Sequence, residues 1–128
     1  MPLRQIKTAR DIAVFLEQSN CLHDADLLSA QFENSGIGTG NPRFIDDRKT
    51  VLRLRYVVTS IRDTVIELVF EGIREWTLRH PPYAEVVDTA LSFTDDGRII
   101  WADDLSTAPE YRRDCSFVIA EKMLWRIV

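Results

Sequence analysis

The densest group of side chains that could do chemistry is the run His23-Asp24-Ala25-Asp26. An imidazole and two carboxylates suit a divalent metal ion. In an extended strand, however, His23 points to one face and both carboxylates to the other, so one ion could not easily gather all three. Aspartate is also favoured where a chain turns, because it hydrogen-bonds to nearby backbone. We therefore predict that His23, Asp24 and Asp26 form a structural corner or line a pocket, without a metal or cofactor.

Two further patterns suggest chemistry but lack the context that chemistry needs. Cys21 and His23 are two residues apart, which places a thiol and a base on the same face of a strand. Nothing in the sequence specifies an orienting group or an oxyanion hole for them. The glycine-rich run 36–40 is followed by Asn41-Pro42, not by the helix start that a phosphate loop requires. We therefore predict a non-enzymatic protein.

Acidic residues are concentrated in one part of the chain. The net charge of −4 argues against nucleic acid as a partner. Residues 81–110 carry seven acidic side chains and one basic side chain, Arg98. A surface of one sign attracts a partner of the opposite sign, although acidic doublets also simply solvate turns. The predicted partner-binding acidic surface consists of Asp88, Asp95, Asp96, Asp103, Asp104 and Glu110.

A short helix is expected near the N-terminus. Thr8 can cap the first backbone N–H groups, and Asp11 occupies the third helical position, where an acid is favoured. Apolar side chains then share one face at helical spacing, and Ser19-Asn20 is a suitable end because Asn tolerates the left-handed conformation. A helix this short is marginal alone, so it must dock on a larger element.

That larger element is a sheet, because apolar and polar residues alternate repeatedly. The alternating segments are 28–33, 52–59, 64–78, 87–93 and 117–127. Period two is typical of half-buried antiparallel strands with one wet face. Thr94-Asp95-Asp96-Gly97 predicts a hairpin turn and Gly72 a bulge, while His80-Pro81-Pro82 should end a strand. Residues 107–113 could hold one irregular helical turn.

The predicted fold is α+β, a short N-terminal helix packed on a mostly antiparallel, curved sheet of about six strands. The length of 128 residues predicts a single domain over 1–128. We find neither a signal-like apolar run nor a stretch long enough to span a membrane, and the two cysteines form no disulfide framework. We therefore expect a cytoplasmic protein that does not bind membranes.

The order of these features resembles that of small bacterial His-Asp-Ala-containing proteins, a group that includes predicted immunity proteins of polymorphic-toxin systems. The resemblance covers residues 12–75 and rests on Phe15-Leu16, His23-Asp24-Ala25, Leu28, Val51-Leu52-Arg53-Leu54 and Ile66–Gly72. It implies a non-enzymatic protein that binds and blocks a toxin domain. It does not identify the contacting residues.

Three functions follow from these observations. The first is a binding protein, including an immunity-like inhibitor, whose partner is a protein such as a basic toxin domain. The second is a small-molecule-binding or enzymatic β-rich domain with a pocket under the helix, lined by residues such as Tyr56, His23 or Asp24. The third is a homodimer built on an exposed strand edge or on a sheet face that bears Trp76, Trp101 or Trp125.

Overall fold

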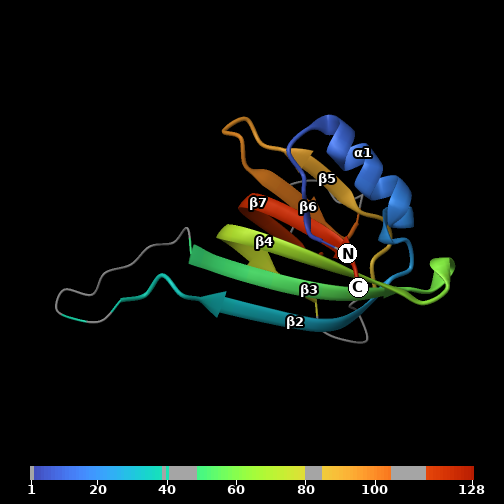
Figure 1. The fold of residues 1–128 in the computed structure, drawn as a ribbon, viewed down its shortest axis with the longest axis horizontal. Coiled ribbons are helices and arrows are strands. Elements are labelled where there is room, and N and C mark those ends of the chain that lie inside the picture. Colours follow the sequence, from blue (N-terminus) through green and yellow to red (C-terminus); the bar gives the residue numbers. More distant parts are fainter. Residues whose placement is uncertain (1, 39, 41–48, 80–84, 105–114) are drawn as a thin grey trace.

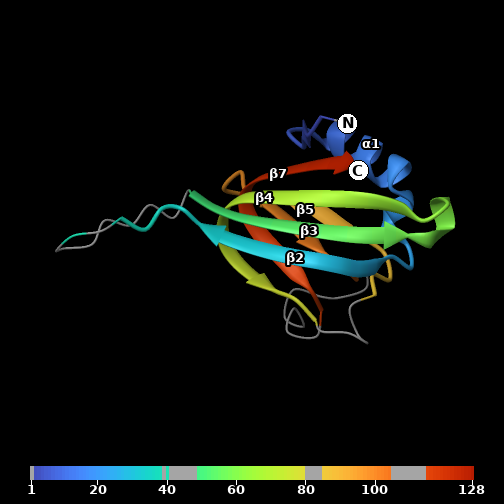
Figure 2. The same ribbon diagram turned by 60° about the horizontal axis from the view of Figure 1, so that its bottom comes forward.

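The computed structural model describes residues 2–38, 40, 49–79, 85–104 and 115–128. One α-helix and seven strands are described, and the sheet strands pair in the order β2-β3-β4-β7-β6-β5, with β1 beside β7 (Figure 1). Every pairing is antiparallel, and the sheet curves without closing, which confirms the predicted α+β fold (Figure 2). The elements are β1 (Arg4–Gln5), α1 (Ala9–Gln18), β2 (Asp26–Asn34), β3 (Thr50–Val58), β4 (Thr64–Thr77), β5 (Ala90–Phe93), β6 (Ile99–Ala102) and β7 (Phe117–Ile127).

The helix α1 begins and ends as its sequence predicts. Thr8 Oγ1 accepts the Asp11 N–H at 3.2 Å, and Asp11 Oδ2 accepts the Thr8 N–H at 3.0 Å, so both halves of a capping box are present. Asn20 has φ 51°, the left-handed conformation expected after the last turn. Phe15 anchors the helix to the sheet, since its buried ring packs edge-on against Trp125 with centroids 5.2 Å apart.

The central strands confirm the alternation read from the sequence. Alternate residues of β3 are buried, and they face alternate buried residues of β4 in the register Leu52↔Phe70, Leu54↔Leu68 and Tyr56↔Ile66. Met123 and Trp125 of β7 continue these rows on the other side of β4. The core therefore lies on the sheet face that α1 covers.

The edge strand β2 departs from the prediction. Leu28 and Phe32 were expected on a buried face, yet they are 56% and 45% exposed. In the described part of the chain, β2 has a strand neighbour only on its β3 side, and α1 packs on Trp125 near the middle of the sheet. The inner face of β2 is therefore left accessible to solvent.

Both predicted glycine irregularities are present. Gly97 has φ +83° in the β5–β6 turn, where the Thr94 N–H donates to the Arg98 carbonyl at 2.8 Å. Gly72 has φ +69° and precedes a bulge in the β4–β7 ladder between Ile73 and Glu75. The bulge lets the Ile73 N–H donate to the Thr50 hydroxyl at 2.7 Å.

Other predictions fall partly or wholly outside the described residues. These are part of the glycine-rich run, the strand end at His80-Pro81-Pro82, the helical turn at 107–113, and Glu110. The fourth predicted strand, 87–93, is shorter than expected, because β5 begins only at Ala90. None of the described helices is long and apolar enough to cross a membrane.

Candidate functional site

The run that contains His23 forms a tight corner between α1 and β2. Cys21, Leu22 and Asp24 all have positive φ, so the chain reverses direction within a few residues. The corner also holds the segment that leads into β5. The Thr89 N–H of that segment donates a hydrogen bond to the Cys21 carbonyl at 2.9 Å. The Val86 N–H donates one to the Ala25 carbonyl at 2.8 Å.

His23 links this corner to the β5 approach through its imidazole. Nδ1 lies 2.9 Å from the Val87 carbonyl and 3.1 Å from Asp88 Oδ1, while Nε2 lies 3.2 Å from Asp24 Oδ2. The hydrogen bond to the Val87 carbonyl raises the pKa of His23, and the charges of Asp24 and Asp88 add to that effect. Acceptors face both ring nitrogens, so the protonated imidazole satisfies the geometry best.

The structure therefore brings together His23 and Asp24 but not Asp26. Asp26 opposes Val57 in the sheet and forms an isolated bridge with Glu85. Asp88 takes its place beside the imidazole, a contact that no local pattern could predict because 65 residues separate the two. Within the described residues, no group of three or more His, Cys, Asp or Glu side chains is arranged to hold a metal ion.

Asp103 does not belong to an acidic surface, so that part of the prediction is wrong. The residue is only 1% exposed. Its Oδ2 lies 2.8 Å from Arg79 Nη2, and its Oδ1 accepts the Ser116 N–H at 3.0 Å. Burial raises the pKa of Asp103 despite the pull of Arg79. A buried carboxylate is retained only where such partners compensate for lost hydration.

The remaining described acids divide between the two ends of the β5–β6 hairpin. Asp95 and Asp96 lie at its turn, where Asp96 pairs with Arg98 at 2.8 Å. Asp88 and Asp104 form an isolated bridge at the opposite end, where Asp88 also contacts His23. Two four-residue strands lie between these ends, so the acids do not form one continuous patch. Their role in partner binding stays a prediction.

The helix–sheet interface is filled by side chains. Phe15 packs on Trp125, and Tyr56 lies 5.9 Å from Trp101, centroid to centroid. Tyr56, which was predicted as a pocket-lining residue, is only 1% exposed, and burial raises the pKa of its phenol strongly. The Tyr56 side chain is therefore a core residue.

An apolar groove lies instead on the part of the core face that is close to β2. Its volume is about 570 Å³. Phe32 of β2 and Trp76 of β4 stack across it, with centroids 5.6 Å apart and planes 22° from parallel. Trp76 is 38% exposed, whereas Trp101 and Trp125 are buried. The groove residues are Leu27, Ala30, Phe32, Leu52, Trp76, Thr77, Leu78 and Arg79.

Sequence reasoning missed this groove because its residues come from β2, β3, the end of β4 and the two residues that follow β4. The signal that could have revealed it is the placement of Trp76 after the Gly72 bulge. A bulge shifts the side-chain alternation, and the register Trp76↔Val118 puts this tryptophan opposite a buried residue. A single groove-facing cation, Arg79, is already paired with Asp103. The described lining of the groove is therefore mainly apolar and carries no unpaired charge.

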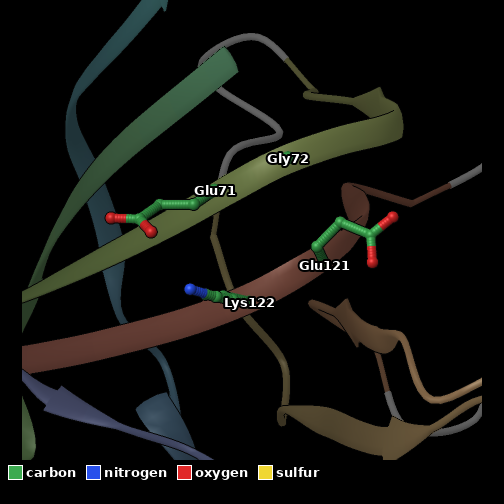
Figure 3. A pocket seen from close by; sticks show the side chains of 4 residues that line it. All are labelled: Glu71, Gly72, Glu121 and Lys122. Atoms are coloured by element: carbon green, nitrogen blue, oxygen red, sulfur yellow. The ribbon is translucent and has the colours of Figure 1, made fainter. Parts of the chain in front are cut away.

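A second hollow is lined mainly by charged residues, but their side chains do not converge. It measures about 340 Å³ and is lined by Glu71, Gly72, Glu121 and Lys122. Glu71 and Lys122 are directly opposed on β4 and β7, and Figure 3 shows them directed away from Glu121. Glu121 is paired with Arg74 at 2.6 Å and with Arg98 at 3.3 Å, and these partners hold its pKa below the usual value. These side chains therefore do not point toward a common position at which a reacting group could bind.

Comparison of the chain with protein-family models, with curated proteins and with solved structures found no match. The resemblance to immunity proteins stays a prediction. Function must therefore be argued from geometry, and among the described residues the groove lined by Phe32 and Trp76 is the strongest candidate surface.

Proposed function

We propose that this chain is a non-enzymatic binding protein whose groove receives a protein partner, as an immunity-like inhibitor of a toxin domain would. The observation that carries the proposal is the exposed stack of Phe32 on Trp76. Aromatic side chains are costly to leave in water, and each offers roughly 150–250 Å² of apolar area. Tryptophan in a concave apolar setting is also the residue type that most often dominates protein interfaces.

The groove is well built to recognise a partner without rearranging. Its aromatic side chains stand on paired strands, β2 against β3 and β4 against both β3 and β7. A site on rigid strands loses little conformational entropy on binding, so more of the contact energy appears as affinity. The apolar lining favours one or two large side chains of the partner as anchors.

The charge of the chain favours a basic partner. The net charge is −4, and Asp95 is exposed at the β5–β6 turn, away from the groove. A net negative charge speeds the encounter with a basic protein, and salt screens that attraction. We expect the association rate to fall as ionic strength rises, while the dissociation rate changes little.

The test uses the product of the neighbouring gene as the candidate partner, with affinity measured by titration calorimetry. Trp76→Ala should weaken binding at least thirtyfold, since loss of a dominant interface aromatic costs about 2 kcal/mol or more. Phe93→Ala is the matched control, because Phe93 is 39% exposed on the other edge strand, β5. Equal losses of affinity in the two variants would contradict the groove as the binding surface. If the unaltered chain does not bind this candidate at all, the neighbouring gene product is not the partner.

The size of the groove supports a second candidate, a small apolar ligand. About 570 Å³ falls within the usual range of ligand pockets, roughly 300–1,000 Å³. N-phenyl-1-naphthylamine, an uncharged fluorescent probe, would report such a site. Saturable micromolar binding that is lost in Phe32→Ala and kept in Phe93→Ala would favour this candidate over a protein partner.

A further inference from the structure

The outer edge of β2 offers unpaired backbone groups beside exposed apolar side chains. β2 lies at one end of the sheet, as Figure 1 shows, and has β3 as its strand neighbour. In the described part of the chain, the partner on its outer side is Glu85, which bridges Asp26 at the start of the strand. The bulge between Leu27 and Ser29 lies at the same end. Among the residues that the structure describes, the segment Leu28–Phe32 is therefore left as an open strand edge.

Apart from features near its two ends, this edge lacks what usually prevents strands from pairing between molecules. Strand edges are commonly protected by charged side chains, above all Lys, by Pro, by a bulge, or by cover from another element. The strand β2, DLLSAQFEN, contains no Lys, Arg or Pro, and its bulge and its two acids, Asp26 and Glu33, lie near its ends. Leu28, at the bulge, and Phe32 are both large, apolar and exposed, and two-residue alternation puts Phe32 on the same face as Ala30.

We propose that β2 pairs with β2 of a second copy of this chain, antiparallel, with the two-fold axis at Ala30. In that register Leu28 lies opposite Phe32 of the other copy, and Ser29 lies opposite Gln31, so both exposed apolar residues find a partner at once. The charges also fit, because Asp26 falls opposite Asn34 and Glu33 opposite Leu27. No carboxylate directly faces another in this antiparallel register. A parallel in-register pairing would instead place Asp26 opposite Asp26 and Glu33 opposite Glu33 of the other copy.

Dimerisation of this kind joins the two sheets into one continuous sheet. The contact is isologous, so it closes with two copies and does not propagate into a fibre. Five residues from each chain make a small interface, so the dimer is weak and depends on protein concentration. The inference is independent of the proposed function, although Phe32 contributes to both the strand edge and the groove.

Site-directed cross-linking tests the register. Cys21 is first replaced by serine, while the buried Cys115 is kept. Ala30→Cys then places two thiols directly opposite each other across the axis, with Cα atoms about 4.5–5.5 Å apart, a separation that a disulfide can bridge. Ser29→Cys is the matched control on the same exposed strand, because its two copies lie diagonally, about 7–8 Å apart, which is too far.

Sedimentation equilibrium up to about 1 mM protein provides the second measurement, with circular dichroism to verify that each variant is folded. We expect the mass to rise from one chain toward two, Ala30→Cys to cross-link at least tenfold faster than Ser29→Cys, and Leu28→Lys to abolish both effects. A mass of one chain throughout would overturn the proposal. So would equal cross-linking of the two variants, or a dimer that Leu28→Lys leaves unchanged, since the contact would then lie on another surface.

Discussion

Replacing Gly72 by alanine should destabilise the fold more than the same change at Gly97. Both residues have positive φ, +69° and +83°, so both variants incur the strain of a left-handed L-residue, about 1–2 kcal/mol. They differ in the space available. A Cβ at Gly72 would lie 2.6 Å from Glu121 Cγ and 2.9 Å from Glu121 Cβ, whereas at Gly97 no described heavy atom lies within 4 Å.

The contact with Glu121 sets the size of the difference. Atoms this close must separate, and Glu121 is not free to swing aside, because its carboxylate is held by Arg74 and Arg98. Overpacking of this kind adds about 1–3 kcal/mol. We therefore expect losses of about 1–2 kcal/mol for Gly97→Ala and about 2–5 kcal/mol for Gly72→Ala.

Urea unfolding of both variants, followed by tryptophan fluorescence, measures these free energies. The gain that alanine gives by restricting the unfolded chain is similar at both sites, so it cancels in the comparison. Glu121→Ala removes the nearer of the two clashing atoms and should therefore reduce the cost of Gly72→Ala. Losses within about 0.5 kcal/mol of each other would refute the reasoning, because that is the precision to which distant sites compare.

Three other variants test single features of the fold. Thr8→Ala removes the cap of α1 and should cost about 1 kcal/mol in the free energy of unfolding. Asp103→Asn leaves Arg79 without its ion-pair partner and should lower the free energy of unfolding by about 3 kcal/mol, the low end for a buried pair because Arg79 is partly exposed. Asp95→Asn, at the exposed turn, is the control and should leave the free energy of unfolding unchanged. The pKa of His23 is raised in the folded state, so its contribution to stability is complete below the unfolded value of 6.5 and is lost as pH rises through the folded value. His23→Gln should therefore flatten the dependence of Tm on pH between pH 6 and 8, and an unchanged slope would contradict the geometry of the corner.

Features that depend on near neighbours in the chain were predictable from the sequence. The capping box joins Thr8 to Asp11, three residues away, and the hairpin turn is completed between Thr94 and Arg98. Strand faces are equally local, because a side chain's direction follows from its parity. These are the features of α1, β3 and the β5–β6 hairpin that the structure confirms.

Features that join distant segments were not predictable from local patterns. β7 pairs with both β4 and β6, although β6 is nearer to it in sequence than β4. The pairing of Arg79 with Asp103 spans 24 residues. Asp103 was predicted to be available to a partner because the charge of a segment shows how many carboxylates it contains. The charge does not show which of those carboxylates are buried.

The exposure of Leu28 and Phe32 could have been inferred by comparing sizes. A ten-residue helix is about 15 Å long and roughly 10–12 Å wide, whereas six strands spaced about 4.8 Å apart span about 24 Å. One helix of that width shields little more than two strands. With α1 docked on Trp125 in β7, the inner face of β2 lies beyond its reach. Alternation predicts which face of a strand is apolar, whereas the area of the covering elements decides whether that face is buried. Here the covering area is too small, which leaves the groove exposed.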